Sequence, residues 1–345
     1  MPSLQVDERQ KSGMPRPDED LGSRFRVLTP RRADYLGRRL GASAIGLVMV
    51  LVAAAVFTPR FFTTANIVLV SQQIGIVGIA ALGQTFCLLV AGIDLSVGAV
   101  SGLTIVVLAV VSAGSNERLA LALVVGLGLG LGLGLVNAFL VTVRKAPPFI
   151  ATFATFTLVE GGLLAWTNGA PSGSIPSGLT VLGAGSVDRV PVPLIVFAGL
   201  AVAAGVVLKG TTYGRRLYAT GSNVSAARLS GVRTRTIVMS AYVLCALFAV
   251  LAGIVVAGYS GYVDNSLVSS INLNCIAAPL IGGTTFAGGV GGAIETSLGV
   301  VLLACVLSFM LFLHTGNSGE LIFEGALMLG AVWLQLQARR QHLRS

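Results

Sequence analysis

The chain has 345 residues, of which 54% are hydrophobic and only 11% are charged. Soluble domains carry about 25% charged residues, and no single soluble core of this size could bury so much apolar sequence. Apolar runs of about 20 residues recur along the chain, and each is long enough to cross a bilayer as a helix. The composition excludes a soluble globular protein and predicts an all-α, polytopic membrane helical bundle.

The net charge of +9 is concentrated in three places. Lysines and arginines gather in the first 39 residues, between Lys209 and Arg235, and near the end at Arg339, Arg340 and Arg344. Basic clusters that flank apolar spans follow the positive-inside rule, so they report membrane orientation. We therefore expect the lipid bilayer, and not a nucleic acid, to be the partner of this basic chain.

Three regions follow from the same pattern. Residues 1–39 are polar, contain proline, glycine and both charge signs, and predict a disordered cytoplasmic tail. Residues 40–337 form the predicted transmembrane domain, which includes a cytoplasmic loop over 209–236. Residues 338–345 predict a short basic cytoplasmic tail. The first apolar stretch starts too far from the N-terminus for a cleaved signal peptide.

Ten membrane spans are expected in chain order, and an even number places both termini in the cytoplasm. The expected spans are 40–57, 66–90, 95–113, 119–143, 149–167, 190–208, 237–258, 271–288, 291–312 and 320–337.

The fourth span contains glycines at alternate positions from Gly126 to Gly134. A lone strand would leave unpaired backbone groups in lipid, so we expect a helix. On a helix, Gly126, Gly130 and Gly134 form a smooth stripe that lets another helix approach closely. The stripe therefore predicts helix packing.

Two segments resemble each other weakly. Residues 80–102 and 277–299 each contain a small-residue helix, a break, and a second helix rich in small residues. The breaks fall at 92–94 and 288–292. We expect an inverted repeat, with the two copies in opposite orientations, as in many transporters.

Residues for covalent chemistry are sparse. No lysine lies in a phosphate-binding loop, so any ATP must bind another chain. Gly258-Tyr259-Ser260-Gly261 matches the short motif of rhomboid-type intramembrane serine proteases, with His314 as a conceivable base. Both residues fall at the outer ends of their spans, which argues against a protease. We expect no catalytic residue and no metal site, and the cysteines 87, 245, 275 and 305 to be small core residues.

The cytoplasmic loop carries the most informative pattern. Ser222 or Asn223 can cap a helix start, Val224 to Ser230 can form about two turns, and Gly231 suits a left-handed stop. Such a short helix, with a small apolar surface between basic flanks, fits the groove of a soluble partner.

This segment resembles the coupling loop of permease subunits in ATP-binding-cassette (ABC) importers, whose signature is Glu-Ala-Ala, three residues, then Gly. The chain has serine in place of the glutamate. The residues that the resemblance assigns to ATPase coupling are Val224, Ser225, Ala226, Ala227, Arg228, Leu229 and Gly231.

Further segments, in the same order along the chain, resemble the ribose-type (monosaccharide) permease family. They are Leu82-Gly83-Gln84-Thr85 with Ala91 to Gly98 (AGIDLSVG), Pro147 to Thr152 (PPFIAT), and Ile276 to Gly289. The resemblance covers about residues 60–337.

The resemblance implies a subunit that is not itself an enzyme and binds no cofactor of its own. ATP and Mg²⁺ would sit on a partner ABC ATPase. A periplasmic or lipid-anchored sugar-binding protein would deliver the solute, and a second permease copy or a paralogue would complete the pathway. The expected location is the bacterial inner (cytoplasmic) membrane, and the expected solute is a monosaccharide or related small polar molecule.

Uncharged polar groups bind sugars without holding them too tightly. The pathway candidates are Gln84, Asp94, Asn137, Thr152, Thr155, Thr284 and Thr285. Asp94 has a second interpretation as the cap of a helix that begins at Leu95. Glu160 and Glu295 depart from the family pattern, and acidic groups at membrane depth usually face a cavity or a partner, unless both lie at a water-reached boundary.

Two other functions remain open from the residues. An ion-coupled secondary transporter would need no ATPase and would use Glu160 and Glu295 as proton or sodium groups. A branched-chain amino-acid-type ABC permease would share the coupling helix and differ in solute. The order of the motifs favours the sugar importer.

Overall fold

The computed structural model describes residues 32–170, 173–263 and 265–342. Contacts between residues divide the chain into two compact units, Met1–Arg39 and Leu40–Ser345. The predicted N-terminal tail lies outside the described residues up to residue 31, and so do the last three residues of the predicted C-terminal tail. Residues 32–39, which the sequence places in the tail, are already helical, because the first described helix begins at Arg32.

The described elements are almost all helices, as predicted. In chain order they are α2 (Arg32–Phe57), η2 (Pro59–Phe62), α3 (Thr64–Leu89), α4 (Val97–Ser112), η3 (Asn116–Arg118), α5 (Leu119–Thr142), α6 (Pro148–Thr167), η4 (Ser177–Leu179), α7 (Thr180–Gly183), β1 (Ser186–Val187), β2 (Val190–Pro191), α8 (Val192–Gly210), α9 (Thr212–Ser222), α10 (Val224–Leu229), α11 (Thr234–Ser260), α12 (Asn265–Gly282), α13 (Ala293–Phe312) and α14 (Gly316–His342). The two strands pair antiparallel as one small hairpin.

Within the described residues, six helices are long and apolar enough to cross a membrane. They are α3, α5 with η3, α6, α8, α11 and α13. Four shorter apolar stretches accompany them at Gly41–Phe57, Val97–Ser112, Ile271–Gly282 and Leu321–Gly330. The chain is therefore an all-α, polytopic membrane protein.

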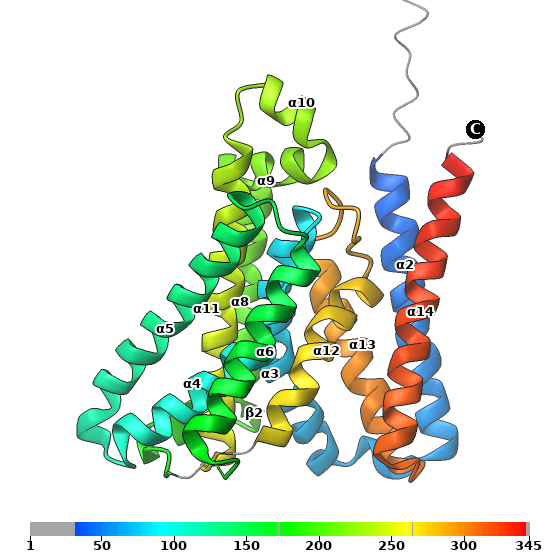
Figure 1. Cartoon of the computed structure of the whole chain (residues 1–345). Coiled ribbons are helices and arrows are strands. Elements are labelled where there is room, and N and C mark those ends of the chain that lie inside the picture. The colour runs from blue at the N-terminus through cyan, green and yellow to red at the C-terminus, as the bar shows by residue number, and fades with distance from the viewer. Residues whose placement is uncertain (1–31, 171–172, 264, 343–345) are drawn as a thin grey trace, which may run out of the picture. The chain divides into compact units, whose positions relative to one another are not determined.

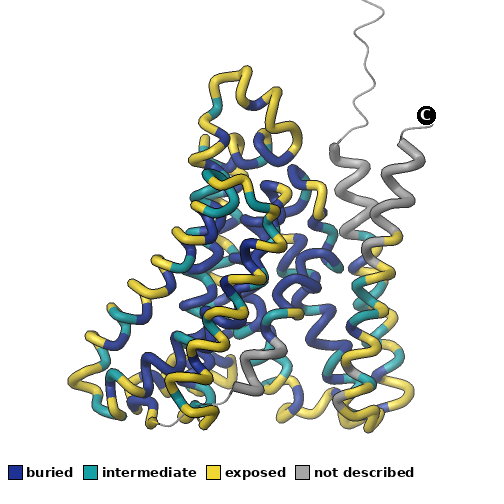
Figure 2. Tube along the Cα trace, viewed as in Figure 1, coloured by how far each residue is buried: buried dark blue, intermediate teal, exposed yellow. Residues whose placement is uncertain are grey.

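Helices α3 and α11 form the centre of the second unit (Figure 1). α11 packs against α3, α4 and α5, while α3 also packs against α8, α12 and α13. The core consists of small and aliphatic side chains from these helices, such as Ile79, Ala249 and Leu303. Because α3 and α11 are central, they are largely buried, while α5 and α6 are exposed along much of their length (Figure 2).

The predicted glycine stripe of the fourth span is confirmed as a packing surface. Gly126, Gly130 and Gly134 are the buried glycines of α5. A Cβ on Gly130 would lie 2.1 Å from Val250 Cγ2, and one on Gly134 would lie 2.7 Å from Ala246 Cβ, both on α11. The absence of side chains at these positions lets the two helices touch.

Both predicted breaks are present, but their predicted opposite orientation is wrong. Residues 90–96 separate α3 from α4, and residues 283–292 separate α12 from α13. The Gly289 amide donates to the Leu89 carbonyl oxygen at 2.9 Å, so α3 and α12 end at the same place. Val77 of α3 and Asn274 of α12 also line one pocket further back along each helix. The two helices therefore run in the same direction.

The end of the predicted eighth span also needs correction. α12 ends at Gly282, six residues before the predicted end at 288. Gly283 has a φ of +110°, and Gly288, Gly289 and Gly291 also have positive φ values. Helical φ values are negative, so this glycine-rich sequence leaves the helix early and forms the irregular break.

Candidate functional site

The short helix predicted in the cytoplasmic loop is present as α10. Asn223 is its N-cap, and the Asn223 side-chain oxygen accepts a hydrogen bond from the Ala226 amide at 2.9 Å. Gly231 follows with a φ of +79°, which is the left-handed stop expected from the sequence. Of the two predicted caps, the structure selects Asn223, because Ser222 still belongs to α9.

α10 presents an almost entirely exposed surface. Leu229 is 91% exposed, and Ala227 is the only buried residue of the helix. Arg228 is exposed beside Leu229, and Arg233 and Arg235 are exposed just after the stop. An apolar side chain so far out in solvent, with exposed arginines nearby in the sequence, has the composition of a protein contact site.

The loop around α10 is more ordered than the sequence indicates. α8 continues to Gly210, α11 already begins at Thr234, and residues 212–222 form α9, which sequence reasoning missed. The side chain of Thr211 caps α9 by accepting from the Gly214 amide at 3.2 Å. The Tyr213 hydroxyl lies 2.9 Å from Ser240 Oγ on α11, and burial raises the pKa of this phenol above its usual range. A threonine cap followed by an amphipathic run was the signal available for this helix.

Asp94 lies fully buried in the break between α3 and α4. Its Oδ1 accepts from the Ser96 amide at 2.8 Å and from the Ser96 hydroxyl at 2.6 Å. Its Oδ2 has no hydrogen-bond partner. α4 begins at Val97, two residues later than predicted, so Asp94 fixes the turn that leads into the helix and does not cap Leu95 directly.

Asn137 of α5 connects Asp94 to α6. Its side-chain nitrogen donates to Ser96 Oγ at 2.8 Å and lies 3.4 Å from Asp94 Oδ1. Its side-chain oxygen accepts from Thr155 Oγ1 on α6 at 2.6 Å. Thr152, one turn earlier on α6, accepts from the Leu95 amide at 3.1 Å. The side chains of α5 and α6 thus hold the first break from one side.

Gln84 holds the same break from the other side. With its amide oriented to satisfy both groups, Gln84 donates to the Asp94 carbonyl oxygen at 3.1 Å and accepts from the Asp94 amide at 3.2 Å. Five of the seven predicted pathway residues therefore form one buried polar network, which we call the Asp94 network. Its members are Gln84, Asp94, Asn137, Thr152 and Thr155, together with Ser96.

Thr284 and Thr285 lie in the second break and outside the Asp94 network. Both are buried. The Thr284 amide donates to the Pro279 carbonyl oxygen at 2.8 Å, and the Thr285 amide donates to that of Val290 at 3.2 Å. The bond between Gly289 and Leu89 brings the two breaks together. Asp94, Thr284 and Thr285 lie in the breaks, and the other four candidates lie on α3, α5 and α6 around Asp94.

The tertiary structure also gathers two cysteines that sequence spacing kept apart. The thiols of Cys87 and Cys245 and a carboxylate oxygen of Asp94 lie within 4.8 Å of one another, all buried. All four cysteines are reduced and buried, as core residues would be. Thiolates bind metals, but removing their charge from water is costly at such depth. Two thiols pack beside a carboxyl group here, and the expected absence of a metal site stays a prediction.

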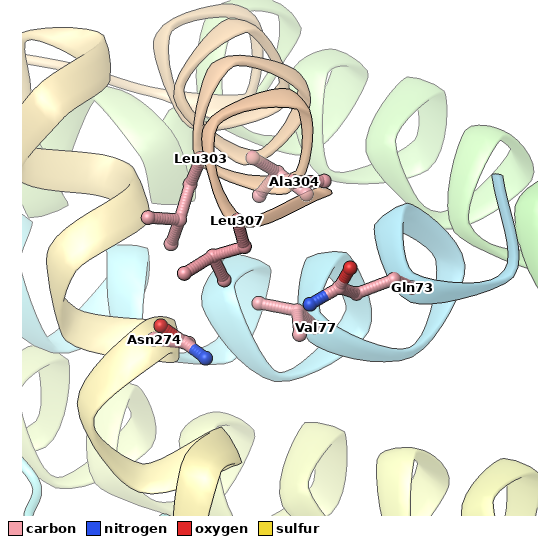
Figure 3. Close-up of a pocket in the computed structure, with 7 residues that line it drawn as sticks. Gln73, Val77, Asn274, Leu303, Ala304 and Leu307 are labelled. Atoms are coloured by element: carbon pink, nitrogen blue, oxygen red, sulfur yellow. The ribbon is translucent and has the colours of Figure 1, made fainter. Parts of the chain in front are cut away.

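A narrow pocket lies between α3, α12 and α13 (Figure 3). The pocket is too narrow to hold a water molecule, and its lining is mainly aliphatic, with the amides of Gln73 and Asn274 as the polar members. Asn274 is buried, and its side-chain oxygen has no hydrogen-bond partner. Sequence reasoning missed both residues, because single amides in apolar spans do not reveal which neighbours they face.

The two acidic departures from the family pattern lie in different environments. Glu160 is exposed on the surface of α6. Glu295 is 3% exposed in the first turn of α13, where a carboxylate complements the helix dipole. The sequence allowed that both glutamates lie at a membrane boundary that water reaches. The burial of Glu295 gives this interpretation no support there. For Glu160 it stays a prediction.

The serine of the protease-like motif has a structural role. The Ser260 hydroxyl lies 3.1 Å from the Val256 carbonyl oxygen and 2.7 Å from that of Tyr262, at the end of α11. His314 is exposed with a φ of +55°. Within the described part of the chain, no hydrogen bond joins these two residues, so they do not form a nucleophile and base pair.

Apolar helices of spanning length, two adjoining chain breaks with buried polar groups, and an exposed helix for a soluble partner define a membrane permease. The chain belongs to the permease family described as the branched-chain amino acid transport system permease component, which it matches over residues 66–332. It is a transport subunit, not an enzyme.

Curated relatives of the chain indicate which permeases within this family it resembles. The chain is 35% identical to the ribose import permease protein RbsC of Bacillus subtilis over 293 residues, covering 84% of this chain and 90% of the relative. It is 32% identical to RbsC of Escherichia coli K12, covering 84% and 91%. It is 30% identical to the autoinducer 2 import system permease protein LsrC of Yersinia enterocolitica, covering 85% and 81%. No solved structure matches the chain.

Proposed function

We propose that this chain is the membrane-spanning subunit of an ABC importer for ribose or a similar small hydroxylated solute. The observation that carries the proposal is α10, a capped, exposed six-residue helix at the position of the ABC coupling signature. The ribose and autoinducer 2 import permeases among its relatives support the direction of transport and the solute class.

The ATPase would dock on α10. Leu229 would enter an apolar groove of the ATPase, and Arg228 would pair with an acidic group at its rim. ATP and Mg²⁺ would be held by that partner. Ser225 is exposed at the second position of α10, where the family signature has glutamate, so the groove of the cognate ATPase would lack a basic partner there.

The solute pathway would use the two breaks and a second permease copy or paralogue. The closed Asp94 network and the buried Thr284 and Thr285 would become accessible when the breaks separate. The exposed Glu160 on α6 is an argument for a second permease subunit at this surface, because a carboxylate that faces lipid from a spanning helix is costly. A periplasmic or lipid-anchored sugar-binding protein would deliver the solute to the outer side.

We further propose ten crossings, with both termini cytoplasmic, in the bacterial inner membrane. The six long helices and the four shorter apolar stretches would supply them. The native cysteines are buried, so single cysteines can be introduced against a silent background. An impermeant maleimide added to intact spheroplasts should label Ser186→Cys in the exposed hairpin and should not label Ser230→Cys beside α10. The opposite labelling pattern would show that the chain has the reverse orientation in the membrane.

The functional test uses the tagged chain purified from its native cell in mild detergent. Recovery of a stoichiometric ATPase, and ATP-dependent ribose uptake after reconstitution with the binding protein, would support the importer. Uptake that needs an ion gradient and no ATP would move the ion-coupled transporter to first place. Competition by leucine and not by sugars would favour the amino-acid-type permease.

The docking surface has a matched control. Leu229→Asp should abolish recovery of the ATPase, because it places a charge in the proposed apolar groove. Val181→Asp changes a 65% exposed aliphatic residue in α7, away from α10, and should leave ATPase recovery unchanged. Equal ATPase recovery for the two variants would overturn the assignment of α10.

A further inference from the structure

The carboxyl end of α9 touches both chain breaks through its backbone. Gly221 is buried, and a Cβ there would lie 1.8 Å from the Leu89 carbonyl oxygen and 2.6 Å from the Gly289 amide nitrogen. A Cβ on Gly289 would lie 2.2 Å from Ser222 Oγ, and one on Gly288 would lie 2.8 Å from the Gly221 carbonyl oxygen. Three segments distant in sequence therefore meet largely backbone to backbone, with only the small side chains of Ser222 and Ala91 at the contact.

The backbone bond from Gly289 to Leu89 closes this contact at 2.9 Å. Side chains can absorb a displacement by changing rotamer, whereas backbones in direct contact must move together. Movement of the end of α9 therefore acts on the end of α3 and on the second break at once. We call the contact of Gly221 and Ser222 with Leu89, Gly288 and Gly289 the glycine junction.

Tyr218 provides a second attachment one turn earlier on α9. Its hydroxyl donates to the Gly291 carbonyl oxygen at 2.7 Å. A Cβ on Gly292 would lie 3.0 Å from the same hydroxyl, so the tyrosine also fits closely against the glycine backbone. α9 thus contacts the second break at two points, which restricts rotation of the break about either one.

Each side of the junction leads to one of the functional elements. α9 ends at Ser222, and only Asn223, the N-cap of α10, separates the two helices. On the other side, Ala91 packs against Gly288 and lies three residues before Asp94, while Gly291 packs against Thr284. The junction therefore connects the exposed helix to the buried polar residues.

We propose that the glycine junction, with Tyr218, transmits displacement of α10 to both breaks and so opens the Asp94 network and the threonine-containing break together. The inference rests on the proposed function only in taking α10 as the ATPase contact. Tyr218, Gly221 and Gly289 are positioning residues: none needs to touch the solute. Their loss should reduce solute moved per ATP hydrolysed and leave ATPase docking intact.

The first test compares two tyrosines of α9 in the reconstituted complex with its ATPase and binding protein. Tyr218→Phe removes the bond to the second break, and Tyr213→Phe removes a bond of similar length to Ser240 on α11. We expect Tyr218→Phe to lower ribose transported per ATP hydrolysed by about threefold or more, because a carbonyl loses its partner. Tyr213→Phe should match the unmodified chain. Equal coupling in both variants would overturn the proposal.

The second test uses a matched pair of glycines. Gly221→Ala forces the junction apart, whereas Gly199→Ala in α8 adds a Cβ with no atom within 4 Å. We expect at least about a tenfold loss of transport per ATP for Gly221→Ala and none for Gly199→Ala, with the ATPase recovered in full from both. If Gly221→Ala does not yield folded protein, the tyrosine pair decides.

The two proposals fail in different ways. If the unmodified complex contains no ATPase, or if Leu229→Asp recovers it in full, the proposed role of α10 is wrong. If Leu229→Asp loses the ATPase while Tyr218→Phe and Gly221→Ala transport and hydrolyse as the unmodified complex does, the junction alone is wrong.

Discussion

The hydroxyl oxygens of Thr85 and Thr296 lie 2.6 Å apart, fully buried between α3 and α13. The bond joins one helix of the first break to one helix of the second. Further along the same two antiparallel helices, Ser308 donates to the side-chain oxygen of Asn66 at 3.0 Å. Interhelical hydrogen bonds of this kind fix the register of helices that lipid alone would not hold.

The threonine pair should behave as a coupled unit. Thr85→Val and Thr296→Val should each lower the free energy of unfolding by about 1 kcal/mol, because each removes the buried hydrogen bond between α3 and α13. The double variant should cost less than the sum, with a coupling energy of about 0.6 kcal/mol. Unfolding in SDS, monitored by circular dichroism, gives the free energy of unfolding of each variant and hence the coupling energy.

Thr157→Val supplies the control for that cycle. Its hydroxyl bonds only within α6, to the Phe153 carbonyl oxygen, and it is exposed. It should leave the free energy of unfolding within about 0.5 kcal/mol of the unmodified chain. Strict additivity of the Thr85 and Thr296 variants would contradict the predicted coupling.

Asn137 is the residue of the Asp94 network whose loss should matter most. Asn137→Leu removes one hydrogen bond each from Thr155 and Ser96 and places an apolar group against Asp94. We expect a loss of about 2 to 4 kcal/mol in the free energy of unfolding, because several buried polar groups lose hydrogen bonds. Asn116→Leu, which removes exposed loop bonds to Ser177 and Gly178, should cost far less. Similar losses for both would show that the network contributes little.

The glycine stripe of α5 offers an internal comparison on one helix. Gly130→Ala places a Cβ against Val250 and should destabilise the domain by about 1 to 3 kcal/mol. Gly132→Ala meets no atom within 4 Å and should be neutral or stabilising by up to about 1 kcal/mol, since alanine favours helix. Thermal unfolding in detergent compares them. A more harmful Gly132→Ala would refute the packing of α5 on α11.

Gly231 tests the stop after α10 by backbone strain alone. A Cβ at Gly231 meets no atom within 4 Å, so Gly231→Val acts through its φ of +79° and not through a clash. Gly261, at the end of α11, has a φ of +72° and equal space. Both valine variants should cost about 1 to 2 kcal/mol in stability.

Only Gly231→Val should also uncouple ATP hydrolysis from transport, because only Gly231 ends the helix that we assign to the ATPase. Transport per ATP hydrolysed, measured in proteoliposomes, separates the two variants. Unchanged uptake with Gly231→Val would count heavily against the coupling assignment, and reduced coupling with Gly261→Val would point to a global effect.

The sequence by itself determined the class, most of the long helices and the short helix α10. Apolar runs of bilayer length give helices because backbone groups in lipid must bond within their own segment. The break at Gly92 to Asp94 and the stop at Gly231 were predictable, since cap and glycine chemistry act between near neighbours. The stripe of Gly126, Gly130 and Gly134 was predictable because helical periodicity places those residues on one face.

Only the tertiary structure decided which distant residues meet. Four polar candidates scattered from Gln84 to Thr155 gather around Asp94, whereas Thr284 and Thr285 lie in the other break. Leu89 meets Gly289, which reverses the orientation expected for the repeat, and Gly221 of the missed helix α9 meets both. These contacts depend on the packing of α3, α11 and α13 across long sequence separations. Local propensity and periodicity carry no information about them, because neither specifies which helix faces cover one another.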